Sequence, residues 1–221
     1  RSDYQPLDRR PIQSRNTRWA AGITNVLVRC RVSPNAISIF GMLAAIAAGA
    51  LFVLTSYTSG LGQRALWLSG GLLCQVRLLC NLFDGMVAVA RGTASAKGEL
   101  YNEVPDRVSD AAIFLGLGYA AGGNVALGYG AAIVAVFVAY VRATAKSIGA
   151  PHDFCGPLAK PQRMALVTLL ALYLACSPSE WRWSFGETQA VLWMVVAGGL
   201  FTAFRRLRRA ARYLETVSNK P

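Results

Sequence analysis

The sequence predicts an all-α integral membrane protein, with six transmembrane helices preceded by an N-terminal amphipathic helix at the membrane interface. Two long stretches, 32–63 and 111–141, contain no charged side chain. About 20 apolar residues suffice to cross the hydrocarbon core of a bilayer, so both stretches are long enough. Because the bilayer interior offers no water, each crossing segment must satisfy its own backbone hydrogen bonds, and a helix does so.

Glycines, prolines and charge clusters divide the apolar sequence into six spans of the length that a bilayer requires. We expect these spans at residues 35–56, 65–90, 100–121, 125–147, 161–177 and 188–212. In this organisation, residues 1–32 form a cytoplasmic arm with the amphipathic helix, residues 33–214 the transmembrane domain, and residues 215–221 a cytoplasmic tail.

The distribution of positive charge predicts the orientation. Most of the 23 Lys and Arg residues lie at the two ends of the chain and in the loops 91–99 and 148–160, whereas the opposite loops hold only Arg64 and Arg182. By the positive-inside rule, both termini and the two basic loops face the cytoplasm, as in a multi-pass protein of a bacterial-type cytoplasmic membrane. The net charge of +12 thus indicates contact with anionic lipid headgroups rather than with nucleic acid.

The segment before the first span has the pattern of an amphipathic helix. Its apolar residues recur at helical spacing and its arginines occupy other faces: Trp19, Ile23, Val26, Leu27 and Cys30 against Arg15, Arg18 and Arg29. Such a helix lies in the membrane interface with its apolar side toward the acyl chains. The alternative is a basic arm that sets the topology without a fixed structure.

Two adjacent predicted spans carry a group of polar side chains. These are Arg77, Asn81 and Asp84 on the second span, and Asn102, Asp106 and Asp110 on the third. Within each span the spacing places the three residues on one helical face. The second span descends to the cytoplasm and the third rises from it, so Asp84 and Asp106 reach a similar depth. Ionisable residues are costly inside a membrane, and such a group is a functional hypothesis.

Carboxylate and amide oxygens are hard ligands, which suit Mg²⁺, Mn²⁺ or Ca²⁺. Mg²⁺ typically bridges carboxylates to substrate phosphates. Gly85 and Gly98 flank the polar group, and their lack of side chains would let a nucleotide or pyrophosphate approach the backbone. The chain has one histidine, His152, and its five cysteines form no CxxC pair, so a zinc site or a disulfide framework has no support.

The same residues carry a family resemblance. The stretch Asn81-x2-Asp84-Gly85-x2-Ala88, followed by Gly98-x3-Asn102-x3-Asp106, resembles the signature of the CDP-alcohol phosphotransferases, D-x2-D-G-x2-A-R-x8-G-x3-D-x3-D. Further landmarks are Ser33-Pro34-Asn35 before the first span, Tyr140-Val141-Arg142-Ala143 at the end of the fourth, and Arg163 at the start of the fifth. The resemblance therefore covers nearly the whole chain.

This chain departs from the signature at three positions. Asn81 and Asn102 stand where the signature has aspartates, and Val89 stands at the signature arginine, with Arg91 two residues later. Two amides in place of two carboxylates make the site two charges less negative, so we expect it to hold cations less tightly or to hold fewer. Glu99 and Glu103 are candidates to compensate; alternatively, they are solvated acids at a helix start.

The resemblance implies that an alcohol hydroxyl attacks the β-phosphorus of a CDP-alcohol and releases CMP. It casts Asp106 as the general base, and Asp84, Asp106, Asn81 and Asn102 as ligands of Mg²⁺ or Mn²⁺. Gly85, Ala88, Arg91 and Gly98 would bind the nucleotide and pyrophosphate. The resemblance also suggests a homodimer.

Basic residues at the cytoplasmic ends of the fourth and fifth spans could bind the phosphate of an acceptor. These are Arg142, Lys146 and Arg163, with Lys160 beside them. Such a pocket would favour glycerol 3-phosphate or an inositol phosphate over choline, whose quaternary ammonium prefers an aromatic cage. The donor would then be the lipid CDP-diacylglycerol (CDP-DAG). Charges that only set the topology are the alternative.

Arg77 lies two turns deeper in the membrane than Asp84, and Asp110 lies one turn deeper than Asp106. We expect them to form a buried ion pair that fixes the register of the two helices. The alternative is a direct catalytic role for Asp110.

Two other functions remain open at the level of sequence. The departures Asn81, Asn102 and Val89 would also fit a catalytically impaired family member that acts as a lipid-binding or scaffold protein. A small transporter fits less well, because the polar group lies at the cytoplasmic end of the spans and no inverted repeat is visible.

Overall fold

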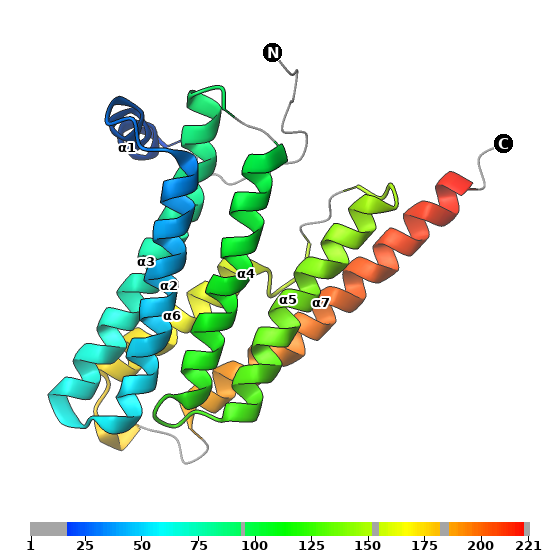
Figure 1. The fold of residues 1–221 in the computed structure, drawn as a ribbon. Helices are drawn as coiled ribbons and strands as arrows, with labels where there is room; N and C mark the ends of the chain where they lie inside the picture. Colours follow the sequence, from blue (N-terminus) through cyan, green and yellow to red (C-terminus); the bar gives the residue numbers. More distant parts are fainter. Residues whose placement is uncertain (1–16, 94–95, 152–154, 182–185, 219–221) are drawn as a thin grey trace.

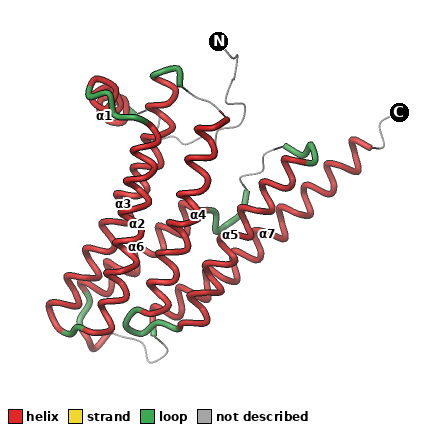
Figure 2. The backbone as a smooth tube through the Cα atoms, in the orientation of Figure 1, coloured by secondary structure: helices red, strands yellow, loops and turns green. Residues whose placement is uncertain are grey.

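The computed structural model describes residues 17–93, 96–151, 155–181 and 186–218, and these form helices without a β-strand. The α-helices are α1 (Arg18–Arg29), α2 (Pro34–Leu54), α3 (Gly60–Ala90), α4 (Ala96–Tyr119), α5 (Val125–Ser147), α6 (Lys160–Cys176) and α7 (Glu187–Ser218). Two single-turn 3₁₀ helices, η2 (Thr55–Tyr57) and η3 (Ser179–Trp181), lie at the loops. The all-α prediction is confirmed for these residues (Figures 1 and 2).

The six longer helices form a bundle. Helix α2 packs against α3 and α4, α4 against α5, α3 against α6, and α5 against α7. In Figure 1, α5 and α7 run side by side and diverge from α2 and α3 toward the upper end. The buried core includes Phe52, Trp67, Phe114, Leu117 and Met164, which come from α2, α3, α4 and α6.

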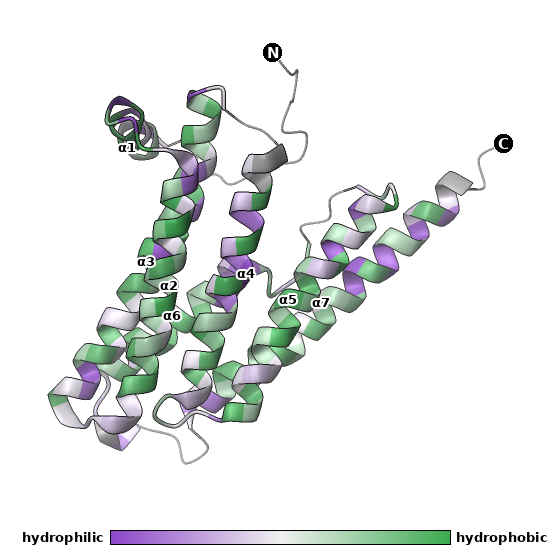
Figure 3. Cartoon of the chain, in the orientation of Figure 1, coloured by the Kyte–Doolittle hydropathy of each residue, from purple (hydrophilic) through white to green (hydrophobic). Residues whose placement is uncertain are grey.

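Four of these helices are long and apolar enough to cross a membrane: Pro34–Tyr57, Gly60–Ala90, Val125–Ser147 and Glu187–Thr216. They make the chain a multi-pass membrane protein. Helices α4 and α6 were also expected to be spans, but α6 has only 17 residues. The first half of α4 carries charged side chains, which colour it as hydrophilic in Figure 3.

Helix α1 forms where the amphipathic pattern lies, and residues 1–16 are outside the described part. It packs on α3, where the ring of Trp19 meets the ring of Phe83 edge-on at 6.0 Å. Ala20 and Thr24 are buried in this contact, whereas Trp19 and Ile23 remain about half exposed. An apolar surface is therefore available on α1 beyond its contact with α3.

The start of α2 is determined locally. The side chain of Ser33 accepts a hydrogen bond from the backbone N–H of Ala36 at 3.2 Å, and Pro34 occupies the first helical position. A serine cap followed by proline is a strong helix start, because it satisfies an orphan N–H group and fixes φ. The Ser33-Pro34-Asn35 landmark is thus a helix cap.

Helices α2 and α4 touch through their backbones. A Cβ atom on Gly49 would lie 2.3 Å from the carbonyl oxygen of Ala112, and one on Gly116 would lie 2.4 Å from that of Gly49. On the other side of α2, a Cβ on Gly41 would lie 2.7 Å from Cβ of Cys80 in α3. Glycines therefore set the spacing of the three helices that carry the polar residues.

Candidate active site

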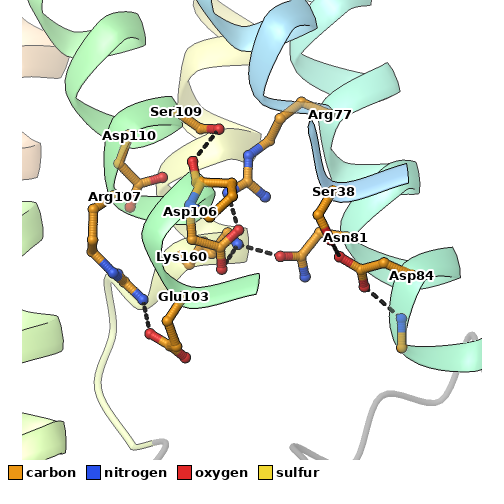
Figure 4. A network of polar contacts seen from close by, with 12 residues as sticks. Ser38, Arg77, Asn81, Asp84, Glu103, Asp106, Arg107, Ser109, Asp110 and Lys160 are labelled. Atoms are coloured by element: carbon orange, nitrogen blue, oxygen red, sulfur yellow. Dashed lines mark hydrogen bonds and ion pairs between the residues drawn. The ribbon is translucent and has the colours of Figure 1, made fainter. Parts of the chain in front are cut away.

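Four of the six predicted polar residues of α3 and α4, Arg77, Asn81, Asp84 and Asp106, converge in a recess bounded by α2, α3 and α4, whereas Asn102 and Asp110 are not part of its lining. The recess is lined by Ser38, Gly41, Met42, Arg77, Cys80, Asn81, Asp84, Asp106 and Ser109. Asp84 and Asp106 therefore share one site, as their positions on a descending and a rising helix predicted. Figure 4 shows the polar side chains, together with Lys160, which reaches them from α6.

Asp84 is held by neutral donors. Its side chain is nearly buried, with an exposed fraction of 5% for the residue. The hydroxyl of Ser38 donates to Oδ2 at 2.7 Å, and the backbone N–H of Gly85 donates to Oδ1 at 2.5 Å. These two hydrogen bonds fix the carboxylate, but they bring no positive charge to it.

Asp106 is held by cations. Arg77 Nη2 lies 2.6 Å from Oδ1, and the Lys160 ammonium forms an ion pair with Oδ2. Lys160 also donates to Oδ1 of Asn81, so one ammonium group connects α3, α4 and α6. Both carboxylate oxygens of Asp106 thus have a positively charged partner.

The predicted pair of Arg77 with Asp110 is wrong. Arg77 is bound to Asp106, while Asp110, which is fully buried, pairs with Arg163 Nη2 at 2.7 Å. The prediction took the partner of Asp110 from the neighbouring span alone. It did not foresee that α6 inserts Lys160 and Arg163, three residues apart and so on one face, into the same cluster.

The acceptor pocket predicted from Arg142, Lys146 and Arg163 is not assembled in this form. Arg163 is 2% exposed, and it is engaged with Asp110 in the interior. Arg142 lies at the surface end of α5, where its guanidinium is 2.6 Å from Glu103 Oε1, and Lys146 is exposed one turn further on. Burial thus separates Arg163 from the other two residues.

Glu103, a candidate to replace a missing carboxylate, is bound elsewhere. Its Oε2 accepts from Arg107 at 2.5 Å, and its Oε1 accepts from Arg142 at 2.6 Å. About half of the side chain is exposed, on the side of α4 that faces these arginines. The acid therefore takes part in a surface ion-pair network. The side chain of Glu99, the other candidate, is outside the described part.

The residues predicted to bind the nucleotide lie at the ends of α3 and α4. Gly85 and Ala88 follow Asp84 on α3, and Gly98 lies in the first turn of α4. Arg91, at the C-cap of α3, donates to the carbonyl oxygen of Val32 at 3.0 Å, and so ties the end of α3 to the start of α2. Residues 94–95, which connect α3 to α4, are outside the described part.

The donor set fits a single hard divalent ion better than a cluster of ions. The recess offers two carboxylates, of which Asp106 is paired with Arg77 and Lys160 and Asp84 has no cationic partner among the described residues. No group of three or more His, Cys, Asp and Glu side chains placed to hold a metal occurs among the described residues. Asp84, whose partners are neutral, is the natural anchor for a hard cation, since carboxylate oxygens are the ligands that such ions prefer.

The bundle thus joins a recess lined by two carboxylates, Asp84 and Asp106, to helices that are long and apolar enough to cross a membrane. The sequence model of the CDP-alcohol phosphatidyltransferase family matches residues 31–203. The chain therefore belongs to this family. The signature residues identified in the sequence lie within the matched region, and Asn81, Asp84 and Asp106 among them line the recess.

Relatives with more specific names are similar over most of their length. The phosphatidylinositol phosphate synthase of Mycobacteroides abscessus is 26% identical over 195 residues, which cover 84% of this chain and 80% of the relative. The crystal structure of Mycobacterium tuberculosis phosphatidylinositol phosphate synthase with CDP-DAG bound gives a TM-score of 0.70 at 21% identity, covering 88% of this chain and 94% of that one.

The same enzyme in complex with manganese and citrate also gives a TM-score of 0.70 at 21% identity, covering 86% of this chain and 87% of that one. At this identity, the likeness shows a shared fold.

Proposed function

We propose that this protein transfers a phosphatidyl group from CDP-DAG to a small phosphorylated polyol and releases CMP. Membership of the CDP-alcohol phosphatidyltransferase family over residues 31–203 carries this proposal. The similarity to a phosphatidylinositol phosphate synthase favours an inositol phosphate as the acceptor, and glycerol 3-phosphate is the second candidate. Conversion of CDP-DAG would place the product in the same membrane as the donor.

Asp106 is the proposed general base. Its carboxylate lies in the recess beside Asp84, and it would accept the proton of the acceptor hydroxyl as that hydroxyl attacks the β-phosphorus. The ion pairs with Arg77 and Lys160 would hold the carboxylate in one orientation during this transfer. The bond from the β-phosphorus to the CMP oxygen breaks, and CMP leaves with the electron pair.

A divalent ion, Mg²⁺ or Mn²⁺, would be held by Asp84, with oxygens of Asn81, Asn102 and Asp106 as the further candidate ligands. Such an ion neutralises charge on the donor pyrophosphate when it is bound. The hard oxygen donors of the recess support this part of the proposal, as does the manganese in the solved structure of similar fold. Ser38 and Gly85 would orient the Asp84 carboxylate toward the ion.

The nucleotide and acceptor would approach from the cytoplasm. Gly85, Ala88, Arg91 and Gly98 form the proposed nucleotide-binding part, at the ends of α3 and α4 near the recess. For the acceptor phosphate we retain Arg142, which is partly exposed, and Lys146, which is exposed.

The membrane arrangement completes the proposal. Helices α4 and α6 would cross the bilayer together with α2, α3, α5 and α7, and α1 would lie in the cytoplasmic interface with both termini on that side. The packing of α4 and α6 within the bundle supports six spans, and the exposed apolar residues of α1 support the interfacial position. Two chains would form a homodimer.

The activity can be tested directly. Purified protein is incubated with CDP-DAG, Mg²⁺ or Mn²⁺, and in turn with inositol phosphate, glycerol 3-phosphate, inositol, glycerol and serine. The lipid product is identified by mass, and CMP release is measured in parallel. We expect a phosphorylated lipid product with one of the first two acceptors. Absence of CMP release with every acceptor would instead support a lipid-binding or scaffold role.

A further inference from the structure

The Lys160 ammonium occupies an unusual position for a lysine at the start of a membrane helix. Lysines there usually extend to water, because their flexible stems allow it. Here the side chain turns inward and is only 17% exposed. It contacts Asn81 Oδ1 on α3 and Asp106 Oδ2 on α4 (Figure 4). The positive charge thus lies between two oxygen atoms of the recess.

The position of Lys160 is fixed by its own helix. Arg163, three residues later on the same face of α6, is buried and bound to Asp110, which sets the rotation of the helix. The loop before α6 is anchored as well, since the backbone N–H of Leu158 donates to Thr202 Oγ1 of α7 at 3.4 Å. Lys160 is therefore directed into the recess by the packing of α6.

The two oxygen atoms that Lys160 contacts belong to the first and the last residue of the signature spacing. Asn81 is one of the two positions where this chain has an amide in place of a carboxylate. With an amide at position 81, Asp106 has two cationic partners, Arg77 and Lys160, and Lys160 pairs with no second carboxylate in the part of the chain that the structure describes. An aspartate at position 81 would be neutralised by Lys160; only without Lys160 would it remain unmatched, and hard cations bind to such oxygens.

We propose that the Lys160 ammonium is a built-in cation of the active site, and that it occupies the position between Asn81 and Asp106 where a divalent ion would otherwise bind. The site then holds one exchangeable divalent ion, anchored by Asp84. This inference rests on the metal-binding part of the proposed function. It assigns Lys160 to positioning and charge balance, rather than to the acceptor phosphate.

The test measures Mn²⁺ binding to the purified full chain in detergent, by the electron paramagnetic resonance signal of free Mn²⁺. The proteins are the wild type, Asn81→Asp, Lys160→Met and the double variant. We expect one Mn²⁺ per chain in the wild type. Asn81→Asp alone should change the affinity by no more than about twofold, because Lys160 neutralises the new carboxylate.

In the Lys160→Met background, the same Asn81→Asp change should tighten Mn²⁺ binding by at least about tenfold or add a second ion, because Arg77 still pairs with Asp106 but the new carboxylate has no cationic partner. Arg208→Met removes one positive charge from an exposed position on α7 and serves as the control, with binding as in the wild type. Equal tightening by Asn81→Asp in both backgrounds would overturn the proposal.

If Lys160→Met does not yield folded protein, Asn102→Asp takes its place. It adds the same charge at the other amide position, whereas the contacts of Lys160 among the described residues are with Asn81 and Asp106. We then expect Asn102→Asp to tighten Mn²⁺ binding about tenfold, and Asn81→Asp to change it within about twofold. Equal effects of the two variants contradict the inference.

Because binding is measured without substrate, its outcome is separate from that of the activity test. A chain that shows the expected binding pattern, yet releases no CMP with any acceptor, would refute the proposed activity and leave the role of Lys160 standing. Conversely, the protein could make the lipid product while Asn81→Asp tightens Mn²⁺ binding equally with and without Lys160. That result would refute the role of Lys160 and leave the proposed activity standing.

Discussion

Asp84 and Asp106 line the same recess, yet their carboxylates have different kinds of partner. Asp84 receives two hydrogen bonds from neutral groups, whereas Asp106 is bound by two cations from different helices. A buried carboxylate without a positive partner is costly, and proteins keep such groups where a ligand supplies the charge. The difference supports the proposal that Asp84 binds an external cation, while the charge of Asp106 is balanced by Arg77 and Lys160.

The largest effect should come from removing either carboxylate. Asp84→Asn and Asp106→Asn should each lower turnover by at least about a hundredfold, the usual contribution of a catalytic group. The contrast lies in the other properties: Asp84→Asn should weaken Mn²⁺ binding more, and Asp106→Asn should lower thermal stability more. CMP release, Mn²⁺ titration and unfolding in detergent measure the three effects. Equal stability losses would mean that the two carboxylates do not differ as proposed.

The buried pair beneath the recess should have the next largest effect, on stability. Breaking a buried ion pair from one side costs about 3–5 kcal/mol, because the other charge is stranded. Arg163→Met and Asp110→Asn should therefore each lower the melting temperature strongly, and the double variant should lose less than the sum.

A second cycle, with Arg77→Met and Asp110→Asn, provides the control. Arg77 and Asp110 have different partners, so their effects should add to within about 0.5 kcal/mol. Strong coupling in this cycle, and none between Arg163 and Asp110, would contradict the pairing in the structure.

Ser38 tests how far Asp84 depends on its neutral donors. Ser38→Ala removes the hydrogen bond to Oδ2 and leaves the backbone donor of Gly85 in place. A hydrogen bond to a charged group contributes about 1.5–3 kcal/mol, so Mn²⁺ affinity and turnover should both fall by about tenfold. Ser38→Thr keeps the hydroxyl and should retain most of both. An unchanged affinity in Ser38→Ala would show that the ion does not depend on the orientation of Asp84.

The smallest effect on stability is expected at the surface pair of Arg142 and Glu103. Because about half of the Glu103 side chain is exposed, Glu103→Gln should change the free energy of unfolding by no more than about 1 kcal/mol. Arg142→Met should be similarly mild for stability but should raise KM for the phosphorylated acceptor. An unchanged KM would remove Arg142 from the acceptor site.

The sequence was sufficient to predict the recess, because helical periodicity alone places Asn81 and Asp84 on one face of α3 and Asn102 and Asp106 on one face of α4. The sequence was insufficient to predict which residues form ion pairs with Asp106 and Asp110. Periodicity says which residues share a face, but the third helix that meets that face depends on how the whole bundle packs. The signal for Lys160 was present, since it lies three residues before Arg163 at the start of a span, but both were interpreted as part of an acceptor-phosphate pocket or as charges that set the topology.

The contact of Gly49 with Gly116 has a consequence for how this enzyme tolerates change. Ser38 and Asp106 lie 11 and 10 residues from these glycines along α2 and α4, or about 15 Å at the rise of an α-helix. A methyl group added at either glycine would push α2 and α4 apart at this contact, and the displacement would extend along both helices to Ser38 and Asp106. The distance between Ser38, which binds Asp84, and Asp106 thus depends on two positions that carry no side chain, so the site is sensitive to a change about three helical turns away from it.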